Sequence, residues 1–175
     1  MKPRPNAKSG ELFTLPRGSS EIDAAVKRAR ALVTKRAALA SAATLIPIPG
    51  LDLAADVATV MQLVPSINQI FGLTPEQIEN LHPQRQAIVY QAIVVGGSAM
   101  IGKIVTTDLV CVALKKVGMK LTVKQATKFV PLAGQAISAV LSFAALRYVC
   151  NQHILECVSV VEGIGARERT IRTPS

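Results

Sequence analysis

Residues 45–56 read Leu-Ile-Pro-Ile-Pro-Gly-Leu-Asp-Leu-Ala-Ala-Asp, and this pattern recurs in altered form later in the chain. Aligning Pro47 with Pro131 places Gly50 opposite Gly134, and each copy leads into a long apolar, Ala-rich segment. Proline disfavours the α conformation in the residue before it, so the chain is expected to run extended at each step before the glycine turns it. Each copy therefore predicts two helices separated by a break.

The two breaks and the composition together predict the fold class. The structural motif consists of Pro47, Pro49, Gly50, Asp52, Pro131 and Gly134. In this motif, Asp52 is placed to accept a hydrogen bond from an unpaired amide at the start of the next helix. The chain has only two Tyr, four Phe and no Trp, which favours closely packed helices over a β-sandwich. We expect an all-α helical bundle of two pseudo-repeated helix-break-helix hairpins.

The two motifs also resemble a known family. The segments Ile-Pro-Ile-Pro-Gly-Leu-Asp at 46–52 and Phe-Val-Pro-Leu-Ala-Gly-Gln-Ala-Ile-Ser-Ala at 129–139 resemble, in the same order, the bacterial DUF697 (YcjF-like) family of helical, often membrane-associated proteins. The resemblance covers roughly residues 38–160. A fainter similarity is to the helical region that follows the GTPase domain in interferon-inducible immunity-related GTPases. The resemblance implies membrane association or a protein partner such as a GTPase, and it supplies no catalytic residues.

Positive charge is concentrated in two parts of the chain. The formal net charge is +9, and nine of the twenty Lys and Arg residues precede residue 37, while five more lie between residues 115 and 128. Such patches attract anionic lipid surfaces, although a merely solvated surface explains the charge equally well. Nucleic acid is disfavoured as a partner because no aromatic residues are interleaved with the patches. The residues predicted to bind an anionic surface are Lys27, Arg28, Lys35, Arg36, Lys116, Lys120, Lys124 and Lys128.

Local signals divide the chain into segments. Residues 1–18 are predicted to form a flexible basic arm, 19–162 a single helical domain and 163–175 a loose basic tail. Pro65 is expected to kink or divide the second helix, and Gly72 to end it. Helices are expected over about residues 20–45, 52–71, 75–81, 84–117, 122–128 and 135–161. In the last helix, three-and-four spacing places one apolar set on a single face: Ile137, Leu141, Ala144, Tyr148, Leu155 and Val158.

Cysteine usage and hydropathy indicate where the protein acts. Three cysteines without framework spacing, and an N-terminus without an apolar leader, indicate a reduced, cytoplasmic protein. Residues 57–75 and 129–146 are uncharged and long enough to span a membrane. Both contain proline, glycine and several polar residues, so peripheral membrane contact is favoured and integral spanning is the alternative.

One segment resembles a nucleotide-binding loop. Gly97-Ser-Ala-Met-Ile-Gly102-Lys103 follows the β-branched run Ile93–Val95, as the P-loop pattern Gly-x4-Gly-Lys would. The next position is Ile104, where a P-loop requires Ser or Thr to bind Mg²⁺. Glycines on the packing face of a helix explain the same letters, so we expect no nucleotide cofactor.

Metal binding and acid–base chemistry are also disfavoured. Cys150, His153 and Cys157 share one helix face and could supply three zinc ligands, but a fourth is missing, so a buried face with a hydrogen-bonded histidine is the preferred interpretation. Asp52 and Asp56 are better explained by the first turn of a helix than by a catalytic pair.

The sequence thus predicts a non-enzymatic, membrane-proximal binding or adaptor module without catalytic residues, metal or cofactor. Its expected partner is an anionic membrane surface, another protein or a second copy of the chain. Two alternatives are a membrane-permeabilising protein, whose hairpins insert, and a degenerate P-loop nucleotide hydrolase.

Overall fold

The computed structural model describes residues 15–43, 51–96, 99–115 and 134–172. These residues form helices and connecting turns, with no strand among them, so the predicted all-α class is confirmed. The helices are α1 (Ser19–Ala43), α2 (Leu51–Ile70), α3 (Pro75–Glu79), α4 (Pro83–Gly96) and α6 (Gly134–Arg172), with a further helical segment over 107–115.

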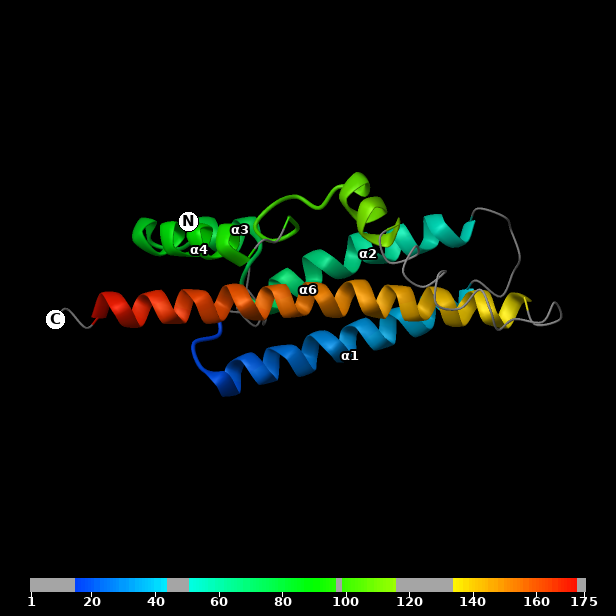
Figure 1. Cartoon of the computed structure of the whole chain (residues 1–175), viewed down its shortest axis with the longest axis horizontal. Helices are drawn as coiled ribbons and strands as arrows, with labels where there is room; N and C mark the ends of the chain where they lie inside the picture. Colours follow the sequence, from blue (N-terminus) through cyan, green and yellow to red (C-terminus); the bar gives the residue numbers. More distant parts are fainter. Residues whose placement is uncertain (1–14, 44–50, 97–98, 116–133, 173–175) are drawn as a thin grey trace, which may run out of the picture.

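Helix α6 is the element on which the others pack. Its 39 residues extend for about 58 Å at 1.5 Å per residue. Helices α1 and α2 lie along it, and α4 packs on its C-terminal half, as Figure 1 shows. Two apolar clusters fill the space between them. The larger contains Phe71, Ile78 and Ile154 among others, and the smaller gathers around Val60, Val64 and Leu146.

Local signals explain the junction between α2 and α3. Gly72 adopts a positive φ of 70°, the amide of Leu73 donates to the carbonyl of Asn68 (2.8 Å), and the amide of Gly72 donates to that of Gln69 (3.2 Å). This is the Schellman arrangement that ends a helix on glycine. Thr74 then accepts from the amide of Gln77 in a capping box that starts α3. The predicted terminator Gly72 is confirmed, and so is the predicted start of the next helix at residue 75.

Pro65 does not divide α2. The helix runs from Leu51 to Ile70 with the proline inside it, so the predicted division is wrong. Pro65 itself is exposed, whereas Leu63, Val64 and Ile67 are buried. Burial of these side chains stabilises the helix on both sides of the missing amide.

The long helix predicted over 84–117 is interrupted. Helix α4 ends at Gly96, residues 103–106 are not helical, and helical structure resumes at residue 107. Gly102 adopts a φ of 67°, and its amide donates to the carbonyl of Leu73 at 3.2 Å. The positive φ and this long-range hydrogen bond hold the segment against the α2–α3 junction, so a continuous helix cannot form.

The C-terminal segment also differs from the prediction. The tail expected to be loose from residue 163 is helical through Arg172, because Ile164 is buried and Glu168 forms an ion pair with Arg85. The expected arm over 1–18 is anchored at its end, where Leu15 and Pro16 are buried.

The apolar face predicted for the last helix is not the buried one. Tyr148 and Leu155 are exposed by 43% and 51%, and Ala144 is exposed too. The face that packs against α1, α2 and α4 is rotated from it, and it contains Leu146, Val149, Cys150, His153, Ile154, Cys157, Val160, Val161 and Ile164. Helix α6 therefore has two apolar faces, and the fold buries one of them.

The pseudo-repeat stays a prediction. Pro47, Pro49, Gly50 and Pro131 lie outside the described residues. Asp52 lies in the first turn of α2, which begins directly after the first Pro-x-x-Gly step, whereas α6 begins at Gly134, the glycine of the second step.

Candidate functional site

The four predicted cations of the N-terminal patch lie together on α1. Lys27, Arg28, Lys35 and Arg36 are all exposed, and we call them the α1 basic stripe. The other four predicted cations, Lys116, Lys120, Lys124 and Lys128, lie outside the described residues. Arg30 is also exposed on α1, although the set predicted from the sequence omits it.

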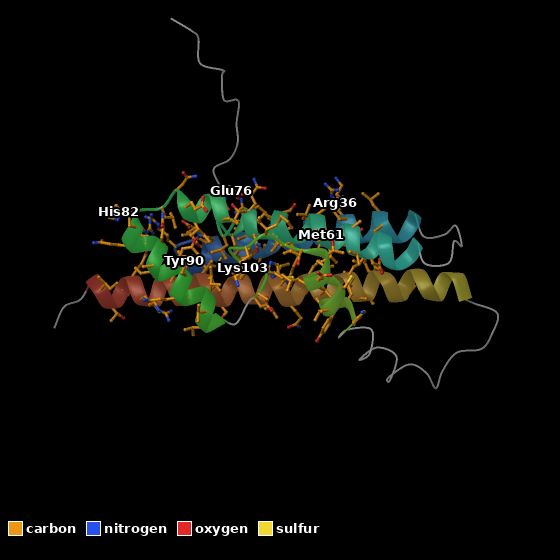
Figure 2. All side chains as sticks on the ribbon, turned by 90° about the horizontal axis from the view of Figure 1, so that it is seen from above. Arg36, Met61, Glu76, His82, Tyr90 and Lys103 are labelled. Carbon is orange, nitrogen blue, oxygen red and sulfur yellow. The ribbon has the colours of Figure 1, made fainter. Side chains whose placement is uncertain are left out.

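The opposite face of α1 explains why the stripe points outward. Ala25, Ala29, Val33 and Ala37 recur every four residues and are buried. These small side chains allow α1 to approach its neighbours α2 and α6 closely, and that contact fixes the rotation of the helix. Figure 2 shows Arg36 extending from the edge of the molecule that lies away from α6.

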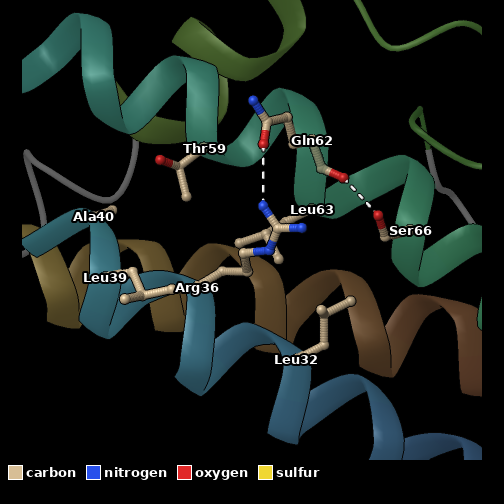
Figure 3. Close-up of a pocket in the computed structure, with 8 residues that line it drawn as sticks. All are labelled: Leu32, Arg36, Leu39, Ala40, Thr59, Gln62, Leu63 and Ser66. Atoms are coloured by element: carbon tan, nitrogen blue, oxygen red, sulfur yellow. Dashed lines mark hydrogen bonds between the residues drawn. The ribbon is translucent and has the colours of Figure 1, made fainter.

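A groove of about 260 Å³ lies between α1 and α2 at one end of the stripe (Figure 3), and we call it the α1–α2 groove. Arg36 donates from Nη1 to Oε1 of Gln62 at 3.4 Å across it. Ser66 donates to the carbonyl of Gln62 at 2.8 Å. The lining residues combine one cation, polar groups and an apolar wall: Leu32, Arg36, Leu39, Ala40, Thr59, Gln62, Leu63 and Ser66.

A larger hollow of about 900 Å³ lies where the start of α4 meets the end of α6. Arg85 donates from Nε (2.9 Å) and Nη2 (2.8 Å) to the same oxygen of Glu168 in its wall. Both side chains are about one-third exposed, so this pair contributes at most about 1 kcal/mol to stability. Arg17 and Arg169 also line this hollow, but the carboxylate of Glu168 lies in the same wall, which makes the hollow a weaker candidate for recognising an anion than the α1–α2 groove.

A buried polar cluster joins α2 to α6. Nε2 of His153 lies 2.8 Å from Oδ1 of Asn68, and Nδ2 of Asn68 donates to the carbonyl of Met100 at 2.8 Å. Since Asn68 uses its amide nitrogen on Met100, its oxygen is the acceptor and Nε2 of His153 carries the proton. Nδ1 of His153 lies 3.4 Å from the carboxylate of Glu156. The preferred interpretation of a buried face with a hydrogen-bonded histidine is therefore confirmed.

The cluster has the residue types of a Cys-His-Asn triad but not its geometry. Sγ of Cys157 lies 3.8 Å from Nε2 of His153, the same nitrogen that donates to Asn68. A nucleophile, a base and an orienting group must use the two imidazole nitrogens separately. Burial raises the pKa of the Cys150 thiol to about 12, and burial with the nearby Glu156 carboxylate raises the pKa of Cys157 as well. Burial therefore favours the protonated form of both thiols, and the cluster joins α2 to α6 within the core.

The segment that resembles a P-loop has a different structure. The run Ile93–Val95, where a P-loop has a strand, lies in helix α4. A β-carbon on Gly102 would lie 3.0 Å from Ile93 and 3.2 Å from Ile78, so close packing explains this glycine. Lys103 is exposed on the turn that follows.

Neither a cluster of metal ligands nor a helix able to span a membrane occurs in the described ranges. Within these ranges, no three His, Cys, Asp or Glu side chains form a group that could hold a metal ion. None of the helices there is both long and apolar enough to cross a membrane.

Comparison with known proteins adds no family to these observations. The chain matches no family model, and no curated protein and no solved structure is significantly similar to it.

Proposed function

We propose that this protein is a non-enzymatic helical module that binds anionic membrane surfaces through the α1 basic stripe. The observation that carries the proposal is that Lys27, Arg28, Lys35 and Arg36 are all exposed on one helix whose opposite face is buried. The acidic residues of α1, Glu21 and Asp23, lie near its start, before the stripe begins.

The strength of this attraction follows from the number of charges. Each basic residue near an anionic membrane surface contributes about 1 kcal/mol, so the four cations supply about 4 kcal/mol at physiological ionic strength. That free energy corresponds to a dissociation constant of about 1 mM. The stripe thus supports a reversible, cytoplasmic attachment to the membrane periphery, and firmer binding requires an additional apolar or specific contact.

Co-sedimentation with liposomes tests the proposal. The variant Lys27→Gln/Arg28→Gln/Lys35→Gln/Arg36→Gln should lose most binding to vesicles containing phosphatidylserine. A matched variant, Arg17→Gln/Lys103→Gln/Arg147→Gln/Arg169→Gln, removes the same charge from exposed positions outside α1 and should bind like the wild type. Wild-type binding should weaken as salt is added, since the Debye length falls from about 10 Å at 0.1 M to about 3 Å at 1 M.

Three outcomes would contradict the proposal. Wild-type protein that ignores anionic vesicles but retains a protein partner would leave only the adaptor function. Equal losses in the two fourfold variants would indicate that net charge, and not the stripe, governs binding. Release of a dye trapped in the vesicles would instead support the membrane-permeabilising alternative, because a peripheral module leaves vesicles intact.

A further inference from the structure

We propose that the α1–α2 groove binds a single anionic amphiphile, with Arg36 holding its phosphate or carboxylate and Leu39 contacting its alkyl chain. The occupant to which we commit is an anionic membrane lipid, and this source rests on the proposed function. The chemistry of the groove itself follows from its own residues.

The guanidinium of Arg36 is available for an anion. Its hydrogen-bond partner among the described residues is Oε1 of Gln62, at a long 3.4 Å from Nη1. A guanidinium has five N–H donors in a planar fork, and it binds phosphate or carboxylate through two of them at once. An anion would therefore replace one weak hydrogen bond with shorter, charge-assisted ones. The eight lining residues include no acid that would compete for this charge.

The wall beside Arg36 is apolar. Leu39 is 61% exposed, Leu32 is half-buried, and both lie on the α1 side of the groove together with Ala40 (Figure 3). Exposed leucine next to an arginine matches a ligand whose charged group is joined directly to an alkyl chain. Leu63 contributes a further apolar lining residue from α2.

A row of residues along one edge of α1 leads to the α1–α2 groove. Arg28, Leu32, Arg36 and Leu39 follow one another at intervals of four, four and three residues, so they lie in a row along one edge of the helix. The basic stripe thus leads an anionic surface toward Arg36.

The volume limits what the groove can hold. Because one water molecule occupies about 30 Å³ in the liquid, 260 Å³ corresponds to roughly nine waters. That space takes an anionic group and the first few methylenes of one chain, and the rest of a lipid stays in the bilayer. The groove therefore supplies the additional contact that the electrostatic attraction of the stripe requires.

Titration of the folded protein with octyl phosphate, kept below its micelle concentration, tests this inference. Amide resonances of residues around the groove, such as Leu39 and Gln62, should shift. Octyl phosphate should bind at least tenfold more tightly than inorganic phosphate, because each methylene that is removed from water on binding raises the affinity about fourfold. Arg36→Gln should weaken binding by about tenfold or more, and Leu39→Ser should reduce the preference for octyl over inorganic phosphate.

The matched control is Lys103→Gln, which removes one exposed charge outside both the groove lining and the α1 basic stripe, and it should change the affinity less than about twofold. The inference is wrong if octyl glucoside binds as tightly as octyl phosphate, if inorganic phosphate does, or if Arg36→Gln binds like the wild type. Binding of octyl phosphate without binding of vesicles would retain the groove and refute the membrane function. If vesicle binding depends on the stripe but octyl phosphate causes no shifts of the amide resonances, the membrane function would be retained and the groove site refuted.

Discussion

Replacing Asn68 by alanine should destabilise the fold strongly, because this side chain joins α2 to two other parts of the core. Asn68 is 2% exposed, and His153, which donates to it, is fully buried. A buried donor left without an acceptor costs about 1–3 kcal/mol, and loss of the hydrogen bond to the Met100 carbonyl adds about 1 kcal/mol. We therefore expect Asn68→Ala to lower the free energy of unfolding by about 2–4 kcal/mol.

Urea denaturation followed by circular dichroism measures this change. Asn80→Ala is the matched control, since Asn80 also donates from Nδ2 to a carbonyl, that of Glu76 at 2.8 Å, but at an exposed site, so its loss should cost less than about 1 kcal/mol. In the double variant Asn68→Ala/His153→Phe the imidazole donor is removed together with its acceptor, so the loss of stability should be smaller than the sum of the losses in the two single variants. The reasoning is refuted if Asn68→Ala costs no more than Asn80→Ala, or if the two changes are additive.

Further predictions concern the glycines of the helices and the buried thiols. Gly96→Ala should destabilise the fold by about 1–3 kcal/mol, because the new β-carbon would lie 2.8 Å from the side chain of Val160. Gly165→Ala, in open space within α6, should instead stabilise the fold by about 0.5–1 kcal/mol. The melting temperatures of the two variants should therefore shift in opposite directions, and equal shifts would contradict the packing. At pH 8 iodoacetamide should react quickly with one of the three thiols of the folded protein, that of Cys111, and with all three thiols of the protein unfolded in urea. Fast modification of two or more thiols in the folded protein would contradict the burial of Cys150 and Cys157. Since burial raises the pKa of Cys150 from 9.0 to about 12, the unfolded thiol ionises first, so stability should be lost as pH rises above 9. Between pH 8 and 10 this thiol should cost about 1.4 kcal/mol, which Cys150→Ala should remove from the measured pH dependence of unfolding; an unchanged slope would refute the assignment.

Local signals in the sequence were sufficient for several elements. The start of α1, the terminator Gly72 and the capping box at Thr74 depend on residues within a few positions of one another, and all three were predictable. The division of the long helix after Gly96 was not, because it depends on the amide of Gly102 reaching the carbonyl of Leu73 on another segment.

The orientation of α6 shows a second limit of periodicity. Apolar residues occur on both sides of this helix, so spacing alone cannot tell which side is buried. Packing against α1, α2 and α4 selects the face with Val149, Cys150 and Ile154, and leaves Tyr148 and Leu155 exposed.

The candidate site, too, was only partly predictable from the sequence. The exposed cations of α1 were predictable, because they alternate with small apolar residues at helical spacing. The α1–α2 groove was not, since Arg36 and Gln62 meet only through the packing of two helices. No local pattern in the sequence indicates that contact.

The measurement that tests the membrane account most directly is the environment of α1 on a vesicle. In a Cys111→Ser background, Ala31→Cys places a polarity-sensitive dye at an exposed position within the basic stripe, and Ser159→Cys places it on the exposed side of α6. On phosphatidylserine vesicles the account predicts a blue shift of the emission at position 31, lost in high salt, and no shift at position 159. A shift at position 159 alone, or at neither position, would contradict it.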